Sequence, residues 1–232
     1  MPYHELSFSE AIDLVTNFVQ DTNMQNVAAN YGLGGLISVQ NFYQAKSPAP
    51  GLYAGTNNWF CLRNTQGSKS LFLAIEKAVD YDPAAPPAAP ASSPLYYNKC
   101  FTYRGGTDHN TIQTFLTNHT TSLQPDTSIS QSDVVNLSCS NFVNNLPGNM
   151  PGYVYRQYSC AFFSDNDQSI LSFLAQVPGV QYLHYYYGLE IISESMKNIV
   201  VIFFPVDAAG TNITVYAGNN VLMLERNYPR RP

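Results

Sequence analysis

The residues of this chain that could carry out nucleophilic chemistry are its four cysteines and four histidines. A cysteine nucleophile needs a histidine base within hydrogen-bond reach. Cys160 and His184 are the best-placed pair, because each lies on a predicted strand and these strands flank a predicted helix over residues 168–176. The pair makes a hydrolase of the Cys/His type one alternative. A strand cysteine between aromatic residues is more typical of a core, and none of the four cysteines lies at a helix N-terminus, where reactive thiols are favoured.

Motifs for a metal or a cofactor are not found in the sequence. No two cysteines have the Cys-x-x-Cys spacing of zinc and redox sites. The carboxylates of Asp108, Asp165 and Asp167 precede predicted helices, where capping is a sufficient role for them. The glycine pairs at 34–35 and 105–106 match neither a P-loop nor a dinucleotide-binding fingerprint. We therefore expect no metal site and no cofactor.

Tyrosine is the more informative residue type, with 17 copies in 232 residues. On the predicted strand over 180–188, alternate side chains point to opposite faces, so His184 shares a face with Tyr182, and Tyr185 shares the other with Tyr187. Tyrosine has a wide apolar body and a polar tip, and it is favoured at recognition surfaces. We expect Tyr182, Tyr185 and Tyr187 to contribute to a neutral binding surface, with a tyrosine-rich interior as the alternative.

The charge content limits the class of partner. Charged residues make up 12% of the chain, about half the usual share of roughly 25%. With 11 Lys and Arg against 16 Asp and Glu, no basic surplus exists to bind nucleic acid. The 45% of hydrophobic residues argues against intrinsic disorder. The start of the sequence does not resemble a signal peptide and no apolar run reaches membrane-span length, so we expect a cytoplasmic protein without a membrane partner.

Apolar periodicity and turn residues predict the elements that must position these side chains. The fold class they predict is α+β, with a mostly antiparallel sheet and a few packing helices. Ser9 is expected to cap the first helix and Asp108 the second, and the segment 70–81 fits either a strand or a helix. Helices are predicted over 9–20, 108–121 and 168–176, strands over 58–64, 95–104, 153–163, 180–188 and 198–206, and a final hairpin pairing 213–216 with 221–225.

A Pro/Ala-rich connector over residues 82–94 divides the chain into segments 1–81 and 95–232. The two segments contain similar features 100 residues apart. The run 37–42 resembles 137–142, the helix 11–20 corresponds to 111–120, and each copy then reaches an aromatic strand with a cysteine, Cys61 or Cys160. This common spacing predicts two related α+β halves that arose by internal duplication and that could pack as one domain.

Two C-terminal stretches, Ser169 to Ile191 and Asn198 to Ile213, resemble a small family of uncharacterised bacterial proteins seen mainly in Bacteroidetes. The shared pattern is a helix, Gln-Pro-Gly, an aromatic strand ending in Tyr-Tyr-Gly, and an apolar strand ending in Val-Asp-x-x-Gly. This chain has Val180 where the family often has cysteine, and His184 where it often has arginine. The family has no known function, so the resemblance implies a fold and a cytoplasmic bacterial setting but no activity.

The leading functional hypothesis is a non-enzymatic protein that acts by binding or self-association through a neutral Tyr- and Asn-rich surface. Its partner could be a second copy in a homodimer, another protein or a small ligand. One alternative is the hydrolase based on Cys160 and His184. The other is an exported effector, or the cytoplasmic partner of one.

Overall fold

The computed structural model describes residues 4–42, 53–65, 68–81, 95–134, 153–154, 177–193, 196–216, 218–220 and 222–226. The predicted helix over 168–176, the connector 82–94 and Cys160 lie outside these residues. The helices are α1 (Phe8–Gln20), α2 (Thr22–Asn30), the 3-10 turn η1 (Val39–Phe42), α3 (His109–Asn118) and α4 (Gln131–Val134). The prediction of an α+β fold with mostly antiparallel strands is confirmed.

Helices α1 and α3 were predicted, but the cap of α1 was not. Ser7, rather than Ser9, caps α1 through a capping box in which Ser7 Oγ accepts from Glu10 N at 3.2 Å and Ser7 N donates to Glu10 Oε2 at 2.8 Å. Asp21 ends α1 and caps α2 by accepting from the backbone N–H groups of Asn23 and Met24. The sequence analysis did not predict α2. Asp108 caps α3 as expected.

The larger sheet has the order β1-β13-β10-β9-β2-β6, and β8 pairs with β10 in the one parallel ladder among the described strands. Its centre is the predicted hairpin of β9 and β10, in which Tyr187 lies opposite Val201 and His184 opposite Phe204. The strands are β1 (His4–Leu6), β2 (Gly34–Ser38), β6 (Cys100–Phe101), β8 (Tyr153–Val154), β9 (Tyr182–Ser193), β10 (Met196–Val206) and β13 (Leu222–Arg226).

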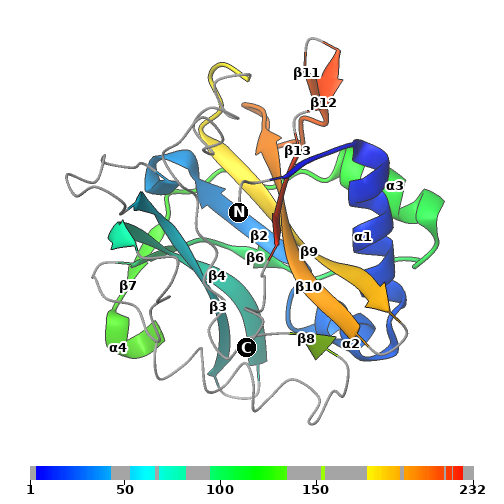
Figure 1. The fold of residues 1–232 in the computed structure, drawn as a ribbon, viewed down its shortest axis with the longest axis horizontal. Helices are drawn as coiled ribbons and strands as arrows, with labels where there is room; N and C mark the ends of the chain where they lie inside the picture. Colours follow the sequence, from blue (N-terminus) through cyan, green and yellow to red (C-terminus); the bar gives the residue numbers. More distant parts are fainter. Residues whose placement is uncertain are drawn as a thin grey trace.

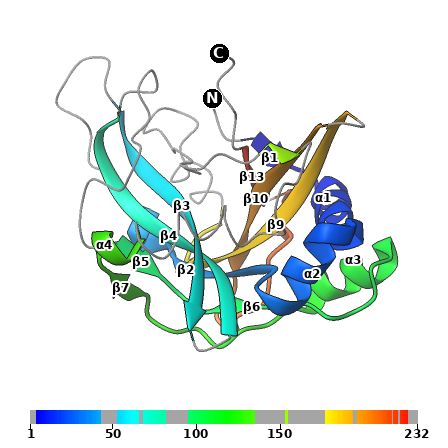
Figure 2. The same ribbon diagram turned by 90° about the horizontal axis from the view of Figure 1, so that it is seen from below.

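The smaller sheet has the order β3-β4-β5-β7, with strands β3 (Tyr53–Thr65), β4 (Ser68–Tyr81), β5 (Leu95–Tyr97) and β7 (Thr127–Ile129). The ambiguous segment 70–81 is therefore a strand. The single strand expected over 95–104 is instead divided: β5 belongs to the smaller sheet, and β6 pairs with β2 in the larger one. Figure 2 shows the β3–β4 hairpin opposite β9 and β10, with β2 and β6 crossing between them.

The expected C-terminal hairpin is wrong in its pairing. The turn at Gly218 joins β11 (Val215–Tyr216) to the short β12 (Asn219–Asn220), as its φ of +84° allows. Strand β13 instead extends the larger sheet, where it pairs with both β10 and β1. A position between β1 and β10 gives β13 a partner on each side, which the two-residue β11 could not supply.

Both sheets combine strands from the two sides of the connector, since β2 pairs with β9 and β4 pairs with β5. The segments 1–81 and 95–232 therefore do not form separate sheets. The two helices of the expected duplication exist as α1 and α3, but the partner features at 137–142 and Cys160 lie outside the described residues. The duplication stays a prediction.

Helices α1, α2 and α3 lie together beside the β9–β10 hairpin (Figure 1). The main core forms between α1, the larger sheet and the inner side chains of β3 and β4. A smaller cluster gathers around Trp59 and Phe72 on the outer face of the smaller sheet. Among the helices that the structure describes, none combines the length and apolar character needed to cross a membrane.

Candidate functional site

The side chain of His184 is fully buried on β9, and both of its ring nitrogens have hydrogen-bond partners. Thr121 Oγ1 lies 2.7 Å from His184 Nε2, and Asn212 Oδ1 lies 2.6 Å from His184 Nδ1. Thr121 follows α3 and Asn212 follows β10, so three distant parts of the chain meet at this imidazole. We call His184, Thr121, Asn212, Tyr186 and His119 the His184 cluster.

The hydrogen bonds of Asn212 determine the protonation of the imidazole. Asn212 Nδ2 lies 2.6 Å from the carbonyl oxygen of Leu116, which can only accept, so this nitrogen is the donor. Asn212 Oδ1 then faces His184 Nδ1 and must accept its proton. In the neutral ring, His184 Nε2 is left as an acceptor for the hydroxyl of Thr121.

A second histidine extends the cluster. Asn212 Nδ2 also donates to Tyr186 Oη at 2.8 Å, and the Tyr186 hydroxyl in turn donates to His119 Nδ1 at 2.7 Å. The rings of His119 and His184 are stacked with centroids 5.0 Å apart, and Phe101 packs edge-on against both. His119 is only half-buried, so one side of the cluster reaches the surface.

The cluster is electrically neutral. Burial lowers the pKa of His184 to about 4, and burial together with the neighbouring His184 lowers the pKa of His119 to about 4. Burial raises the pKa of the Tyr186 phenol, which stays protonated. At neutral pH the five side chains form one uncharged network of donors and acceptors.

The loop after β10 holds Asn212 in this position. Asp207 Oδ1 accepts from the backbone N–H groups of Ala209 and Thr211, and Thr121 N donates to the carbonyl oxygen of Gly210 at 3.0 Å. Gly210 has a φ of +85°, and a Cβ there would collide with the Thr121 carbonyl oxygen. The close approach of the two loops therefore requires glycine at this position.

The expected Cys160–His184 pair is not formed by the described residues, because Cys160 lies outside them. His184 has no free ring nitrogen for a cysteine, since Thr121 and Asn212 occupy both. Of the cysteines that are described, Cys61 is buried and Cys100 is half-buried with its thiol pKa raised by burial. A raised pKa disfavours the reactive thiolate.

The expected alternation of faces along β9 is confirmed, but the expected surface position of its tyrosines is not. Tyr185 and Tyr187 are both 0% exposed, so they cannot contribute to an exposed recognition surface in this structure. Tyr182, at the start of β9, is half-buried, and its binding role stays a prediction. The physical reason is the smaller sheet, which covers this face: Tyr185 Oη accepts from Leu73 N on β4 at 3.0 Å.

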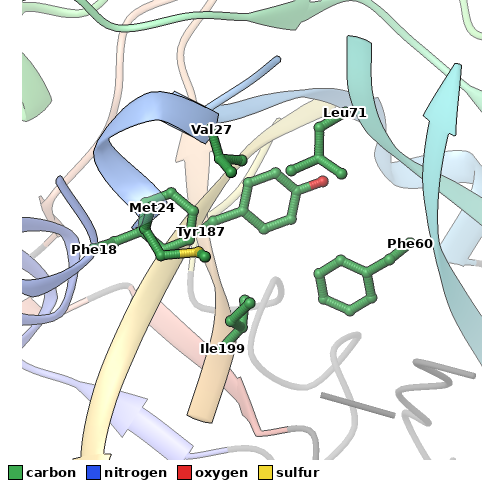
Figure 3. Close-up of a pocket in the computed structure, with 7 residues that line it drawn as sticks. All are labelled: Phe18, Met24, Val27, Phe60, Leu71, Tyr187 and Ile199. Atoms are coloured by element: carbon green, nitrogen blue, oxygen red, sulfur yellow. The ribbon is translucent and has the colours of Figure 1, made fainter. Parts of the chain in front are cut away.

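Tyr187 lies in an apolar pocket between α1, α2 and the smaller sheet (Figure 3). The lining side chains pack so closely that no space between them is wide enough for a water molecule. Phe18 stacks on the Tyr187 ring at 6.1 Å, and Phe60 lies 5.5 Å away on the other sheet. The lining residues are Phe18, Met24, Val27, Phe60, Leu71, Tyr187 and Ile199.

Among the described residues that line this pocket, Tyr187 alone has a polar group on its side chain, and that hydroxyl has no hydrogen-bond partner. Its polar neighbour is the Tyr185 hydroxyl, which accepts from Leu73 N and makes no hydrogen bond of acceptable geometry with Tyr187. Burial raises the pKa of Tyr187 well above its ordinary value. The phenol therefore remains a neutral O–H group, with the Tyr185 hydroxyl as its polar neighbour.

Two acids, the half-buried Asp126 and the buried Glu76, have structural roles. Asp126 accepts from the backbone N–H of Ser38 and from the side chains of Asn41 and Asn98, which joins β2 to the segment before β7. Glu76 accepts from Trp59 Nε1 at 2.9 Å within the β3–β4 hairpin. In the part of the chain that the structure describes, no three His, Cys, Asp or Glu side chains gather in a way that could hold a metal ion.

Comparison of the chain with protein-family models, with curated proteins and with solved structures finds no significant match. The resemblance to the bacterial family therefore stays a prediction. Thr121, Asn212 and the apolar pocket were not found by sequence reasoning, since none of them belongs to a recognisable motif.

Proposed function

We propose that this protein binds a small, mostly apolar and uncharged molecule in the pocket around Tyr187. One observation carries the proposal: Tyr187 lines an apolar pocket, and its fully buried hydroxyl has no hydrogen-bond partner. The leading expectation of a binding protein is kept, but the binding site moves from an exposed tyrosine surface to this interior pocket. Self-association and a cytoplasmic setting stay predictions.

An unpartnered buried hydroxyl has a cost. Leaving such a group without a hydrogen bond destabilises a protein by roughly 1–3 kcal/mol, and nearly all buried polar groups have a partner. A water molecule cannot serve here, because the pocket is too narrow to hold one. A ligand that brings an acceptor atom would complete the Tyr187 hydrogen bond and cover the surrounding apolar side chains.

The chemistry of the pocket defines the ligand class. The neutral phenol of Tyr187 donates, so the ligand needs an acceptor such as a carbonyl or ether oxygen. The other six lining residues are apolar, so a charged ligand would be desolvated without compensation. The side chains must move apart for the ligand to enter. Met24, with an unbranched and flexible side chain, is the most adaptable of them.

A matched pair of probes tests this proposal. Acetophenone and α-methylstyrene have nearly the same shape, but only acetophenone has a carbonyl oxygen. We expect the wild-type protein to bind acetophenone more tightly, and Tyr187→Phe to weaken acetophenone binding about fivefold while leaving α-methylstyrene binding unchanged. Tyr182→Phe, on the same strand but outside the pocket lining, is the control and should change neither affinity.

The stability of Tyr187→Phe provides a second readout. Because the hydroxyl it removes has no partner, the substitution should leave the free energy of unfolding unchanged or raise it by up to about 1 kcal/mol. Equal acetophenone affinity in the wild-type protein and in Tyr187→Phe, or a clear loss of stability in that variant, would contradict the proposal.

A further inference from the structure

Thr121, His184 and Asn212 form a chain of hydrogen bonds with the order of a nucleophile, a base and a residue that orients the base. The Thr121 hydroxyl lies 2.7 Å from His184 Nε2, and His184 Nδ1 lies 2.6 Å from Asn212 Oδ1. Both distances are within the range in which a base takes a proton from a hydroxyl nucleophile. The bond from Asn212 Nδ2 to the Leu116 carbonyl fixes the amide, and so fixes which imidazole nitrogen is free to accept.

We propose that Thr121 is an acyl-accepting nucleophile for small carboxylic esters, with His184 as its base and Asn212 as the positioning residue. This inference rests on a different face of β9 from the Tyr187 pocket and does not depend on the binding function proposed above. In this arrangement the nucleophile beside His184 is the Thr121 hydroxyl, whereas the sequence analysis expected a cysteine thiol there.

The exposure of the three residues agrees with these roles. Thr121 is half-buried and its neighbour Thr120 is exposed, so Thr121 is the most exposed of the three residues. His184 lies behind Thr121 and is fully buried, and Asn212 is 9% exposed. The base is thus more deeply buried than the nucleophile, and burial lowers the pKa of His184 to about 4, so the ring is neutral at pH 7.

The reaction proceeds in two balanced steps. Thr121 Oγ1 forms a bond to the ester carbonyl carbon while its proton passes to His184 Nε2. The carbon–oxygen bond to the alcohol then breaks, and the leaving alcohol takes the proton from His184. Water next attacks the acyl group on Thr121, its proton passing through His184 Nε2 to Thr121 Oγ1, and the free carboxylic acid departs.

Incubation of the full chain with p-nitrophenyl acetate tests the proposal. We expect release of p-nitrophenol together with an acetyl group that peptide mass spectrometry locates on Thr121. Thr121→Ser should keep the reaction, and Thr121→Val should slow p-nitrophenol release by at least about tenfold. Thr117→Val, on the exposed side of α3 and outside the His184 cluster, is the matched control that should react as the wild type does.

Asn212 requires a readout that a merely structural role would not change. In the wild-type protein, ¹⁵N NMR should show the His184 proton on Nδ1, and Asn212→Leu should shift it toward Nε2 and slow acetylation of Thr121. Site mapping on the wild-type chain keeps the proposal testable even where a variant does not fold. Acetyl groups found only on amines, or an unchanged rate in folded Thr121→Val, would overturn it.

Discussion

Asn212 Oδ1 lies 2.6 Å from His184 Nδ1, and this contact sets which nitrogen of the buried imidazole carries the proton in the His184 cluster. Because the Asn212 amide nitrogen donates to both Tyr186 Oη and the Leu116 carbonyl, its oxygen has one available role, as acceptor for His184. Asn212 therefore connects the loop after β10, the end of α3 and strand β9.

Replacement of Asn212 should be costly. Asn212→Leu leaves His184 Nδ1 and the Leu116 carbonyl without their partners in a buried site, and we expect it to lower the free energy of unfolding by about 3 kcal/mol. Urea denaturation measures this change. Asn30→Ala, which removes an exposed side-chain amide on α2, should change stability by less than about 0.5 kcal/mol. Similar effects of the two substitutions would refute the structural importance of Asn212.

The two stacked histidines should make stability depend on pH. Their pKa values fall from 6.5 to about 4 on folding, so between these values the unfolded chain binds protons that the folded protein does not. Stability is then present above about pH 6.5 and is lost as the pH falls toward 4, with a slope of up to about 2.7 kcal/mol per pH unit for two protons. The titratable groups packed against His184 are His119 and Tyr186.

Two variants separate titration from packing in this pH profile. His119→Phe removes one of the two titrating groups and should reduce the slope to about half. Phe115→Leu removes an aromatic ring stacked on His119 at 4.8 Å, and it should lower stability equally at every pH without changing the slope. An unchanged slope in His119→Phe would mean that this histidine does not titrate in the manner described.

Two glycines with the same backbone conformation should respond differently to substitution. Gly210 and Gly218 have φ values of +85° and +84°, but only at Gly210 would a Cβ meet another backbone, the carbonyl of Thr121. Gly218→Ala should cost about 1 kcal/mol from left-handed strain, and Gly210→Ala on the order of 3 kcal/mol or more because the two loops must separate. Thermal denaturation of the two variants distinguishes the cost of left-handed backbone strain from the cost of a collision with the Thr121 carbonyl. Equal costs would argue against the close contact.

The N-terminal cap of α1 can be located by two serine substitutions. Ser7→Ala removes both sides of the capping box with Glu10 and should cost about 1 kcal/mol. Ser9 lies inside the helix, where alanine has the higher helix propensity. Ser9→Ala should therefore change the free energy of unfolding by less than about 0.5 kcal/mol. A larger loss of stability in Ser9→Ala than in Ser7→Ala would indicate that Ser9 is the N-terminal cap, as the sequence analysis predicted.

Much of the fold could be predicted from local patterns. The apolar periodicity of α1, the Asp108 cap of α3 and the β-branched and aromatic runs of β9 and β10 each depend on neighbours in sequence, and each was predicted correctly. Helix α2 was missed because Asp21 ends one helix and begins the next without a loop between them. The pairing of β13 with β1 and β10 depends on contacts far apart in the chain, which no local signal specifies.

The candidate sites depend almost entirely on such distant contacts. The sequence analysis singled out His184 but paired it with Cys160. Thr121 and Asn212 reach His184 through a bridge between Thr120 and Thr211 that the sequence does not signal. Tyr187 was expected on a surface because period 2 gives the face of a residue but not what covers that face. The β3–β4 hairpin, from the other end of the chain, covers it.

The most direct test of ligand binding at Tyr187 is NMR of the Met24 methyl group during titration with acetophenone. Met24 is fully buried and lines the pocket, so we expect its methyl resonance to shift in a saturable way in the wild-type protein. In Tyr187→Phe the same shift should require about fivefold more acetophenone. A Met24 resonance that stays unchanged at saturating probe, or shifts confined to residues outside the pocket, would contradict the account.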